Sequence, residues 1–186
     1  MMRSPLSRFV PYLLWGVGVL LIFRGARDLL DSRIGQAQAA RAFGKTEPGE
    51  SLARLTIPRL ATELYVVEGA GERELRRGPG HLRGTALPGE NGNCVIAGHR
   101  DTHFRVLKDI RVGDEIVLET HSGRYVYRVR RLRAIPPDNT APLRPAADAE
   151  LNLITCYPFY YVGAGNGAGV VGSAGTLTYC TCAPAD

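Results

Sequence analysis

Residues 151–159 read LNLITCYPF, and this stretch joins a strand-forming run to an abrupt turn. Four of its first five residues suit a buried β-strand. Proline donates no backbone hydrogen bond and pushes the residue before it into an extended or turn conformation, so Tyr157-Pro158 ends the strand. Cys156 therefore lies at the exposed end of a strand. Its thiol is either part of the packing, half of a disulfide, a metal ligand or a nucleophile.

Short strand-like runs dominate the chain upstream of this cysteine. HSG, at 121–123, has the composition of a hairpin turn, and helical patterns are brief, at 71–77 and 103–109. Many short strands separated by Gly- and Pro-rich loops predict a mostly β fold, a closed or nearly closed β-barrel. The predicted strands are residues 52–58, 63–69, 93–98, 114–120, 124–132 and 151–156.

The N-terminal segment has a different composition. After a basic segment, residues 1–8, the run FVPYLLWGVGVLLIF (Phe9 to Phe23) carries no charge. These fifteen residues fall short of the roughly 20 that a full span needs, but Arg24 can snorkel and apolar residues continue beyond it. A cleaved signal peptide is the alternative, but no small-x-small cleavage site follows closely. We expect an uncleaved signal anchor, a transmembrane helix over residues 9–30, with the domain outside the cytoplasm.

Residues 31–51 are predicted to be a helical stalk and a linker, because an Ala-, Leu-, Arg- and Gln-rich run is followed by GKTEPGES. The whole chain has 186 residues and a formal net charge of +5. Its basic residues are scattered, with no run longer than a pair. This pattern favours a membrane or cell-wall surface at least as much as a nucleic acid, and we expect no nucleic-acid partner.

The other three cysteines offer little chemistry by themselves. Cys94 lies in the apolar run GNCVIAG and is expected to be a buried, inert thiol. Cys180 and Cys182 alternate along the tail and cannot easily bridge each other. None of the spacings is that of a zinc knuckle, so neither a metal nor a cofactor is expected.

A histidine at a second strand end changes the interpretation of Cys156. In IAGHRDTHF, residues 96–104, the strand-like run ends at Gly98 and His99 begins the loop. A thiol and an imidazole at separate strand ends suggest a nucleophile with an acid/base partner. The remaining histidines are expected to be core or surface residues: His81, His103 and His121.

Three separated motifs resemble those of sortases, the membrane-anchored cysteine transpeptidases of bacterial surfaces. They are TCYPF (155–159), AGHRDTHF (97–104) and LARLTIPRL (52–60). GPGHLRGTALPGENGNCVIAGHRD, residues 78–101, is similar to the segment before the catalytic histidine in class D-like sortases and in the related enzymes of Gram-negative bacteria. The resemblance covers roughly residues 50 to 163, and we assign residues 52–163 to the catalytic domain.

This resemblance implies an eight-stranded barrel with Cys156 as nucleophile and His99 as acid/base. The thiolate would attack the Thr carbonyl of an LPxTG-like sorting signal and form an acyl-thioester, and an amine acceptor on the cell surface would resolve it. Thr155 either hydrogen-bonds the substrate or only stands in the strand. Tyr157 is expected to contact the substrate, in a groove that Phe159 and Tyr160 also line unless these rings only pack. Asp101 either orients His99 or caps the 103–109 helix.

The tail departs from the family pattern. Sortases carry an arginine on the strand after the cysteine loop, in a segment resembling AP-x-R-F, whereas Arg144 is the last basic residue of this chain. The break near Ala164 is what a reading-frame shift would produce, and it makes the last strand doubtful. The rival is a diverged but real final strand, GVVGSAG or TLTYC. Residues 164–186 are therefore an atypical tail, with upstream arginines as the only candidate replacements: Arg100, Arg128 and Arg130.

Two functions follow from these observations. The first is an active sortase, and the alternative is a catalytically impaired sortase domain that binds a sorting peptide or hydrolyses it slowly. A papain-like hydrolase is the third possibility, but the Cys-Trp context typical of that class is missing. An arginine within reach of Cys156 would discriminate the first two functions.

Overall fold

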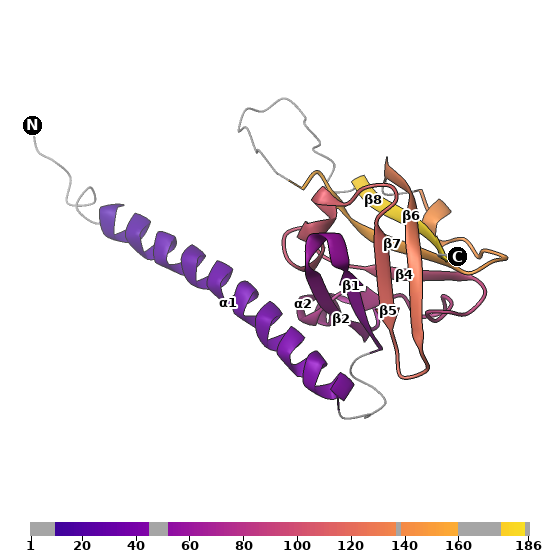
Figure 1. Cartoon of the computed structure of the whole chain (residues 1–186). Coiled ribbons are helices and arrows are strands. Elements are labelled where there is room, and N and C mark those ends of the chain that lie inside the picture. The colour runs from indigo at the N-terminus through magenta and orange to yellow at the C-terminus, as the bar shows by residue number, and fades with distance from the viewer. Residues whose placement is uncertain (1–9, 45–51, 137–138, 160–175, 185–186) are drawn as a thin grey trace, which may run out of the picture.

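The computed structural model describes residues 10–44, 52–136, 139–159 and 176–184. A long N-terminal helix precedes a β-barrel that short helices interrupt (Figure 1). The elements are α1 (Val10–Gly44), β1 (Ala53–Ile57), η2 (Pro58–Leu60), β2 (Thr62–Glu68), α2 (Glu72–Arg77), β3 (Gly80–His81), β4 (Asn93–Ala97), η3 (His103–Asp109), β5 (Glu115–Glu119), β6 (Arg124–Ile135), η4 (Ala141–Leu143), β7 (Glu150–Tyr157) and β8 (Thr176–Pro184).

The strands form one closed barrel in the order β1-β2-β3-β4-β7-β8-β6-β5. Most neighbours are antiparallel, but β2 pairs with β3 and β4 pairs with β7 in parallel. The mostly β, sortase-like barrel predicted from the sequence is therefore confirmed. The parallel contact between β4 and β7 matters for function, because parallel neighbours end at the same edge of the sheet.

The interior of the barrel follows from the alternation of side chains along each strand. In β1, Ala53, Leu55 and Ile57 are fully buried, and the residues between them are partly exposed. In β6, Tyr127 and Val129 are buried in the core, and Arg128 between them is exposed. The largest fully buried side chains are Phe104, Leu55, Ile57, Ile96, Ile116, Leu118, Leu151, Leu153, Val66, Val95, Val129 and Asn152.

The doubt about the last strand was wrong. Residues 176–184, TLTYCTCAP, form β8, which pairs antiparallel with both β6 and β7 and closes the barrel. Closure needs backbone hydrogen bonds and a run of β-forming residues, and neither requires an arginine. TLTYC was one of the two rival strands considered, while GVVGSAG lies outside the described residues.

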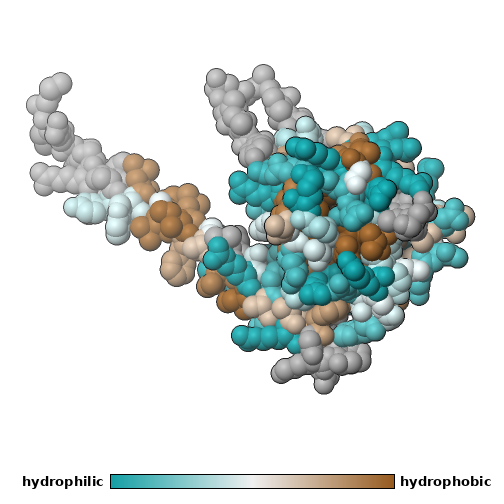
Figure 2. Space-filling view, viewed as in Figure 1, coloured by the Kyte–Doolittle hydropathy of each residue, from teal (hydrophilic) through white to brown (hydrophobic). Residues whose placement is uncertain are grey.

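The first half of α1 is an exposed apolar surface. Ten large hydrophobic side chains between Tyr12 and Phe23 are 44% to 75% exposed, and Figure 2 shows them as a brown band along the part of α1 that stands clear of the barrel. None of the described helices contains a stretch long and apolar enough to cross a bilayer. The transmembrane helix over residues 9–30 stays a prediction, and Phe9 lies outside the described residues.

The second half of α1 packs against the barrel and α2. The Gln36 amide donates to the carbonyl oxygens of Tyr65 and Arg77, each at 3.0 Å, and its oxygen accepts from the Tyr65 N–H at 2.8 Å. Ala39 is fully buried, and the Phe43 ring stacks on His121 with 5.0 Å between centroids. The segment predicted to be a stalk is thus helical up to Gly44, and it is attached to the domain.

Candidate active site

The two predicted catalytic residues lie at the ends of neighbouring parallel strands: His99 follows β4, and Cys156 is near the end of β7. In the β4–β7 pair, Ala97 lies opposite Ile154, and the Gly98 N–H donates to the Ile154 carbonyl at 3.0 Å. Two residues further along each chain come His99 and Cys156. Because adjacent strands lie about 4.8 Å apart, this register brings both residues to the same end of the barrel.

Cys156 is a free, half-buried thiol at the second-to-last position of β7, just before the chain leaves the sheet. On its other side β7 pairs with β8, and Leu177 is the residue opposite Cys156. No residue of β8 is basic. The strand next to the cysteine therefore offers no guanidinium.

The Thr155 side chain is bound within the sheet. Its side chain is buried, and its hydroxyl donates to the Gly98 carbonyl at 2.7 Å. This bond ties the end of β7 to the residue before His99. The predicted contact of Thr155 with substrate stays a prediction.

Aromatic side chains border the cysteine. Tyr157 is 43% exposed, and its ring meets the Phe159 ring edge-on, with 6.3 Å between centroids. Phe159 also packs against the hydrophobic core. Tyr157, which follows Cys156 in the chain, is thus accessible, and its contact with substrate stays a prediction. Tyr160 lies outside the described residues.

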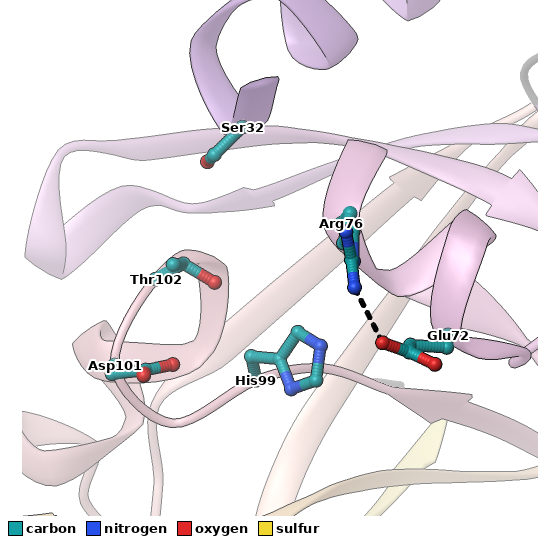
Figure 3. Close-up of a pocket in the computed structure, with 6 residues that line it drawn as sticks. All are labelled: Ser32, Glu72, Arg76, His99, Asp101 and Thr102. Atoms are coloured by element: carbon teal, nitrogen blue, oxygen red, sulfur yellow. Dashed lines mark hydrogen bonds and ion pairs between the residues drawn. The ribbon is translucent and has the colours of Figure 1, made fainter. Parts of the chain in front are cut away.

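His99 opens into a pocket of about 260 Å³. Figure 3 shows the imidazole between its own loop and α2, with Ser32 of α1 above. Of the six residues drawn there, only Glu72 and Arg76 are joined, by a charge-assisted hydrogen bond of 2.5 Å. The pocket is lined by Ser32, Glu72, Arg76, His99, Asp101 and Thr102.

Asp101 lines this pocket beside His99, but Figure 3 draws no bond between the two. The helix that follows, η3, has Thr102 as its N-cap residue, without a side-chain capping bond. Among the residues drawn, Asp101 therefore makes no hydrogen bond that would orient His99 and none that would cap η3. The carboxylate nevertheless contributes negative charge to the same pocket.

The loop after His99 is braced by α1. The His103 ring is buried, and its Nε2 lies 3.0 Å from the Ser32 hydroxyl. Burial lowers the pKa of His103, and the Ser32 contact opposes that shift in part. A neutral imidazole in this place holds η3 against α1, so His103 is the structural residue that the sequence predicted.

Sequence reasoning missed the contribution of Ser32, Glu72 and Arg76 to the pocket. These residues come from two helices far from His99 in the chain, and nothing in their local sequence marks them. Only the docking of α1 and α2 beside the His99 loop brings them together.

Cys94 provides a contrast to Cys156. It is 1% exposed inside β4, and burial, assisted by the negative charges of Glu68 and Glu90, raises its pKa to about 12. The thiolate is the reactive form, so this buried thiol is inert, as predicted. Within the described parts of the chain, no group of three His, Cys, Asp or Glu side chains could hold a metal ion.

Of the three upstream arginines, one approaches the cysteine. The Arg100 guanidinium donates through Nη1 to the Pro158 carbonyl at 2.9 Å. Arg128 instead bonds Glu115, and its backbone pairs with Ala183, six residues along β8 from Leu177. A strand rises about 3.3 Å per residue, so Arg128 lies roughly 20 Å along the sheet from the level of Cys156. Arg130 is two residues from Arg128 on the same strand and is also far from Cys156.

Comparison with known proteins agrees with this arrangement. The family model described as "Sortase domain" matches residues 55–174. Sortase D of Bacillus subtilis is 37% identical over 129 residues, which are 69% of this chain and 65% of that protein. Sortase SrtE1 of Streptomyces coelicolor is 31% identical over 169 residues, 81% of this chain and 48% of that protein. The alignments thus span about two thirds and one half of these relatives.

Solved structures give the same fold. A Clostridium perfringens sortase D5 transpeptidase superposes with a TM-score of 0.66 at 22% identity, covering 84% of this chain and 99% of that chain. Sortase A from Corynebacterium diphtheriae gives 0.64 at 25% identity, covering 81% and 67%. A family match over well more than half of the chain, on a barrel that sets His99 and Cys156 at neighbouring strand ends, shows that this protein belongs to the sortase family and resembles its class D members.

Proposed function

We propose that this chain is a cysteine transpeptidase that joins a protein carrying a C-terminal LPxTG-like sorting signal to an amine acceptor on the cell surface. Cys156 is the nucleophile and His99 the acid/base. The observation that supports this proposal is the parallel register of β4 and β7, which brings the ends of these two strands to the same end of the barrel.

The reaction follows from the chemistry of these two groups. The Cys156 thiolate attacks the Thr carbonyl carbon of the sorting signal, a C–S bond forms, and the scissile C–N bond breaks. His99 gives its proton to the departing amine nitrogen. In the second half, the acceptor amine attacks the thioester and gives a proton to His99, and the C–S bond breaks to regenerate the thiolate. Tyr157, exposed and next to Cys156 in the chain, contacts the peptide.

The pocket beside His99 suits the acceptor side of this scheme. It lies next to the imidazole that must deprotonate the incoming amine, and it is open to solvent between α2 and the His99 loop. The family match favours this active transpeptidase over the alternative of a sorting-peptide binder.

Trapping of the acyl-enzyme tests the assignment. We expect intact-mass spectrometry to detect a thioester adduct after incubation with a sorting-signal peptide, and to find none in Cys156→Ala. The matched control is Cys94→Ala, which removes a buried thiol of the neighbouring strand and should still form the adduct. An adduct that persists in Cys156→Ala would remove Cys156 from the mechanism.

We further propose that residues 9–30 hold the protein at the bacterial cell membrane as a single pass, with the catalytic domain outside the cytoplasm. The exposed apolar side chains between Tyr12 and Phe23 support this location, because water disfavours so large an apolar surface. Fractionation of cells expressing the chain with and without residues 1–30 tests it. Recovery of both forms in the soluble fraction would contradict the proposal.

A further inference from the structure

The two reacting residues lie between two hydrogen bonds that join the same two loops. Before them in each segment, the Thr155 hydroxyl donates to the Gly98 carbonyl at 2.7 Å. After them, the Arg100 guanidinium donates to the Pro158 carbonyl at 2.9 Å. His99 and Cys156 are therefore enclosed on both sides by direct links between their own neighbours.

We propose that Arg100 is a positioning residue for the transpeptidation reaction, which fixes the Cys156 turn against the His99 loop. It acts through the Pro158 carbonyl, and no contact with substrate is needed. This inference rests on the proposed roles of His99 and Cys156, and it gives Arg100, which the sequence offered only as a candidate replacement for the missing arginine, a positioning role instead.

The two hydrogen bonds fix different parts of the site. The bond from Thr155 is buried and continues the sheet, where Gly98 N–H already bonds Ile154. Beyond this point β4 has ended, so no ladder joins the His99 loop to the Cys156 segment, although Cys156 and Tyr157 still pair with β8 on their other side. Arg100 supplies the next link, and a long side chain with five donors is suited to span the gap between two loops.

The energetic argument concerns geometry. A single charge-assisted hydrogen bond to a carbonyl at a partly exposed place contributes little to stability, but misplacement of a reacting group by about 1 Å can cost about 10²-fold in rate. Loss of the Arg100 bond should therefore affect catalysis far more than folding.

The experiment compares Arg100→Ala and Arg100→Lys with Arg105→Ala. Arg105 is an exposed arginine of η3, the helix that follows the His99 loop, so its removal changes the charge equally and leaves the Pro158 link intact. We measure kcat and KM for a fluorogenic sorting peptide, and separately the rate at which iodoacetamide alkylates Cys156 at pH 7. Chymotryptic peptides separate Cys156 from Cys180 and Cys182, because Phe159 lies between them.

We expect Arg100→Ala to lower kcat by about 10- to 100-fold with KM nearly unchanged, and to slow alkylation of Cys156. Lysine keeps the charge and one donor, so Arg100→Lys should recover part of both losses, and Arg105→Ala should match the parent chain. Equal kcat and alkylation rates in Arg100→Ala and Arg105→Ala would overturn the proposal.

The alkylation measurement also distinguishes a failure of this proposal from a failure of the proposed function. If the parent chain does not turn over the peptide, that result counts against the transpeptidase assignment. A slower alkylation in Arg100→Ala, rescued by lysine, would still support the positioning role, and an unchanged rate would overturn it.

Discussion

Gly35 of α1 lies directly against the backbone of Arg77 in α2. A Cβ at position 35 would come within 2.5 Å of the Arg77 Cα and 2.7 Å of its carbonyl oxygen, and backbone atoms cannot move aside as a side chain can. Glycine at this position therefore permits the close contact of α1 with α2. That contact also places Ser32, one turn earlier, beside His103 and in the wall of the His99 pocket.

The first prediction is that Gly35→Ala loosens the docked half of α1. Forcing a methyl group into this contact should lower the free energy of unfolding by about 1 to 3 kcal/mol and increase hydrogen exchange in residues 31–44. The matched control is Gly25→Ala on the same helix, where a Cβ has nothing within 4 Å. Alanine favours helix over glycine by about 1 kcal/mol, so the control should be neutral or stabilising. Equal effects of the two substitutions on exchange would show that α1 does not depend on this contact.

Turnover of the sorting peptide is the second measurement on the same pair of variants. Loss of the Ser32 wall should lower activity in Gly35→Ala and leave it unchanged in Gly25→Ala. A Gly35→Ala variant with increased exchange and full activity would show that α1 braces the fold without serving the site.

A third prediction concerns pH and follows from His103. Burial holds the pKa of this imidazole below its ordinary value of about 6.5, so the folded protein resists a proton that the unfolded chain accepts. The free energy of unfolding should therefore fall as the pH drops through that value, and this contribution should be complete above it. Urea denaturation at pH 8 and pH 5.5 measures the difference.

The variant His103→Gln separates this effect from other titrations. Glutamine stays neutral at both pH values, so the variant should lose less stability than the parent between them, even if it is less stable at pH 8. An undiminished drop in the variant would assign the pH dependence to other groups.

The strand pattern of the barrel was predictable from sequence because its cause is local. In β1 every second residue is apolar, and in β6 the same alternation runs from Tyr125 to Val129, and the pleat turns those residues inward. The strand β3, Gly80–His81, was not predicted, because two residues are too few to show an alternation of apolar and polar side chains. The last strand was doubted because the family's arginine is missing, although strand pairing is a property of the backbone.

The site was only half predictable for a related reason. His99 and Cys156 are visible because each follows a strand-like run, and a resemblance connects them. The pocket wall is not visible, because Gly35 and Gln36 determine where α1 docks and no local pattern identifies them. The link from Arg100 to Pro158 joins residues 58 positions apart, and only the parallel pairing of β4 and β7 brings them together.

The fourth prediction concerns the chemical reactivity of Cys94 and Cys156. With a pKa of about 12, Cys94 forms almost no thiolate at pH 8, and its burial excludes reagents. Iodoacetamide should label Cys156 in the folded protein and Cys94 only in urea. Rapid labelling of Cys94 in the folded state would mean that β4 opens readily, and would weaken Cys94→Ala as a control.

The last prediction concerns the arginine that β8 lacks. Because β8 carries no basic residue, the oxyanion has no guanidinium donor from the strand beside Cys156, and loss of one such donor typically slows turnover by about 10²- to 10³-fold. We therefore expect weak turnover by this chain, and recovery when the residues after Ala164 are replaced by a strand containing AP-x-R-F. A single substitution sharpens the test. Residues paired across neighbouring strands carry their side chains on the same face, so an arginine introduced by Leu177→Arg would share the face of Cys156.

The matched control is Thr178→Arg, which adds the same charge one residue along β8 and therefore on the opposite face. Leu177→Arg should raise kcat for the fluorogenic peptide well above that of the control, because only there does the guanidinium reach the developing negative charge. Equal turnover by the unmodified chain and Leu177→Arg, both at the level of the replaced tail, would show that a residue outside β8 already supplies this charge. Arg100, bonded to Pro158 two residues after the nucleophile, would then be the first residue to remove.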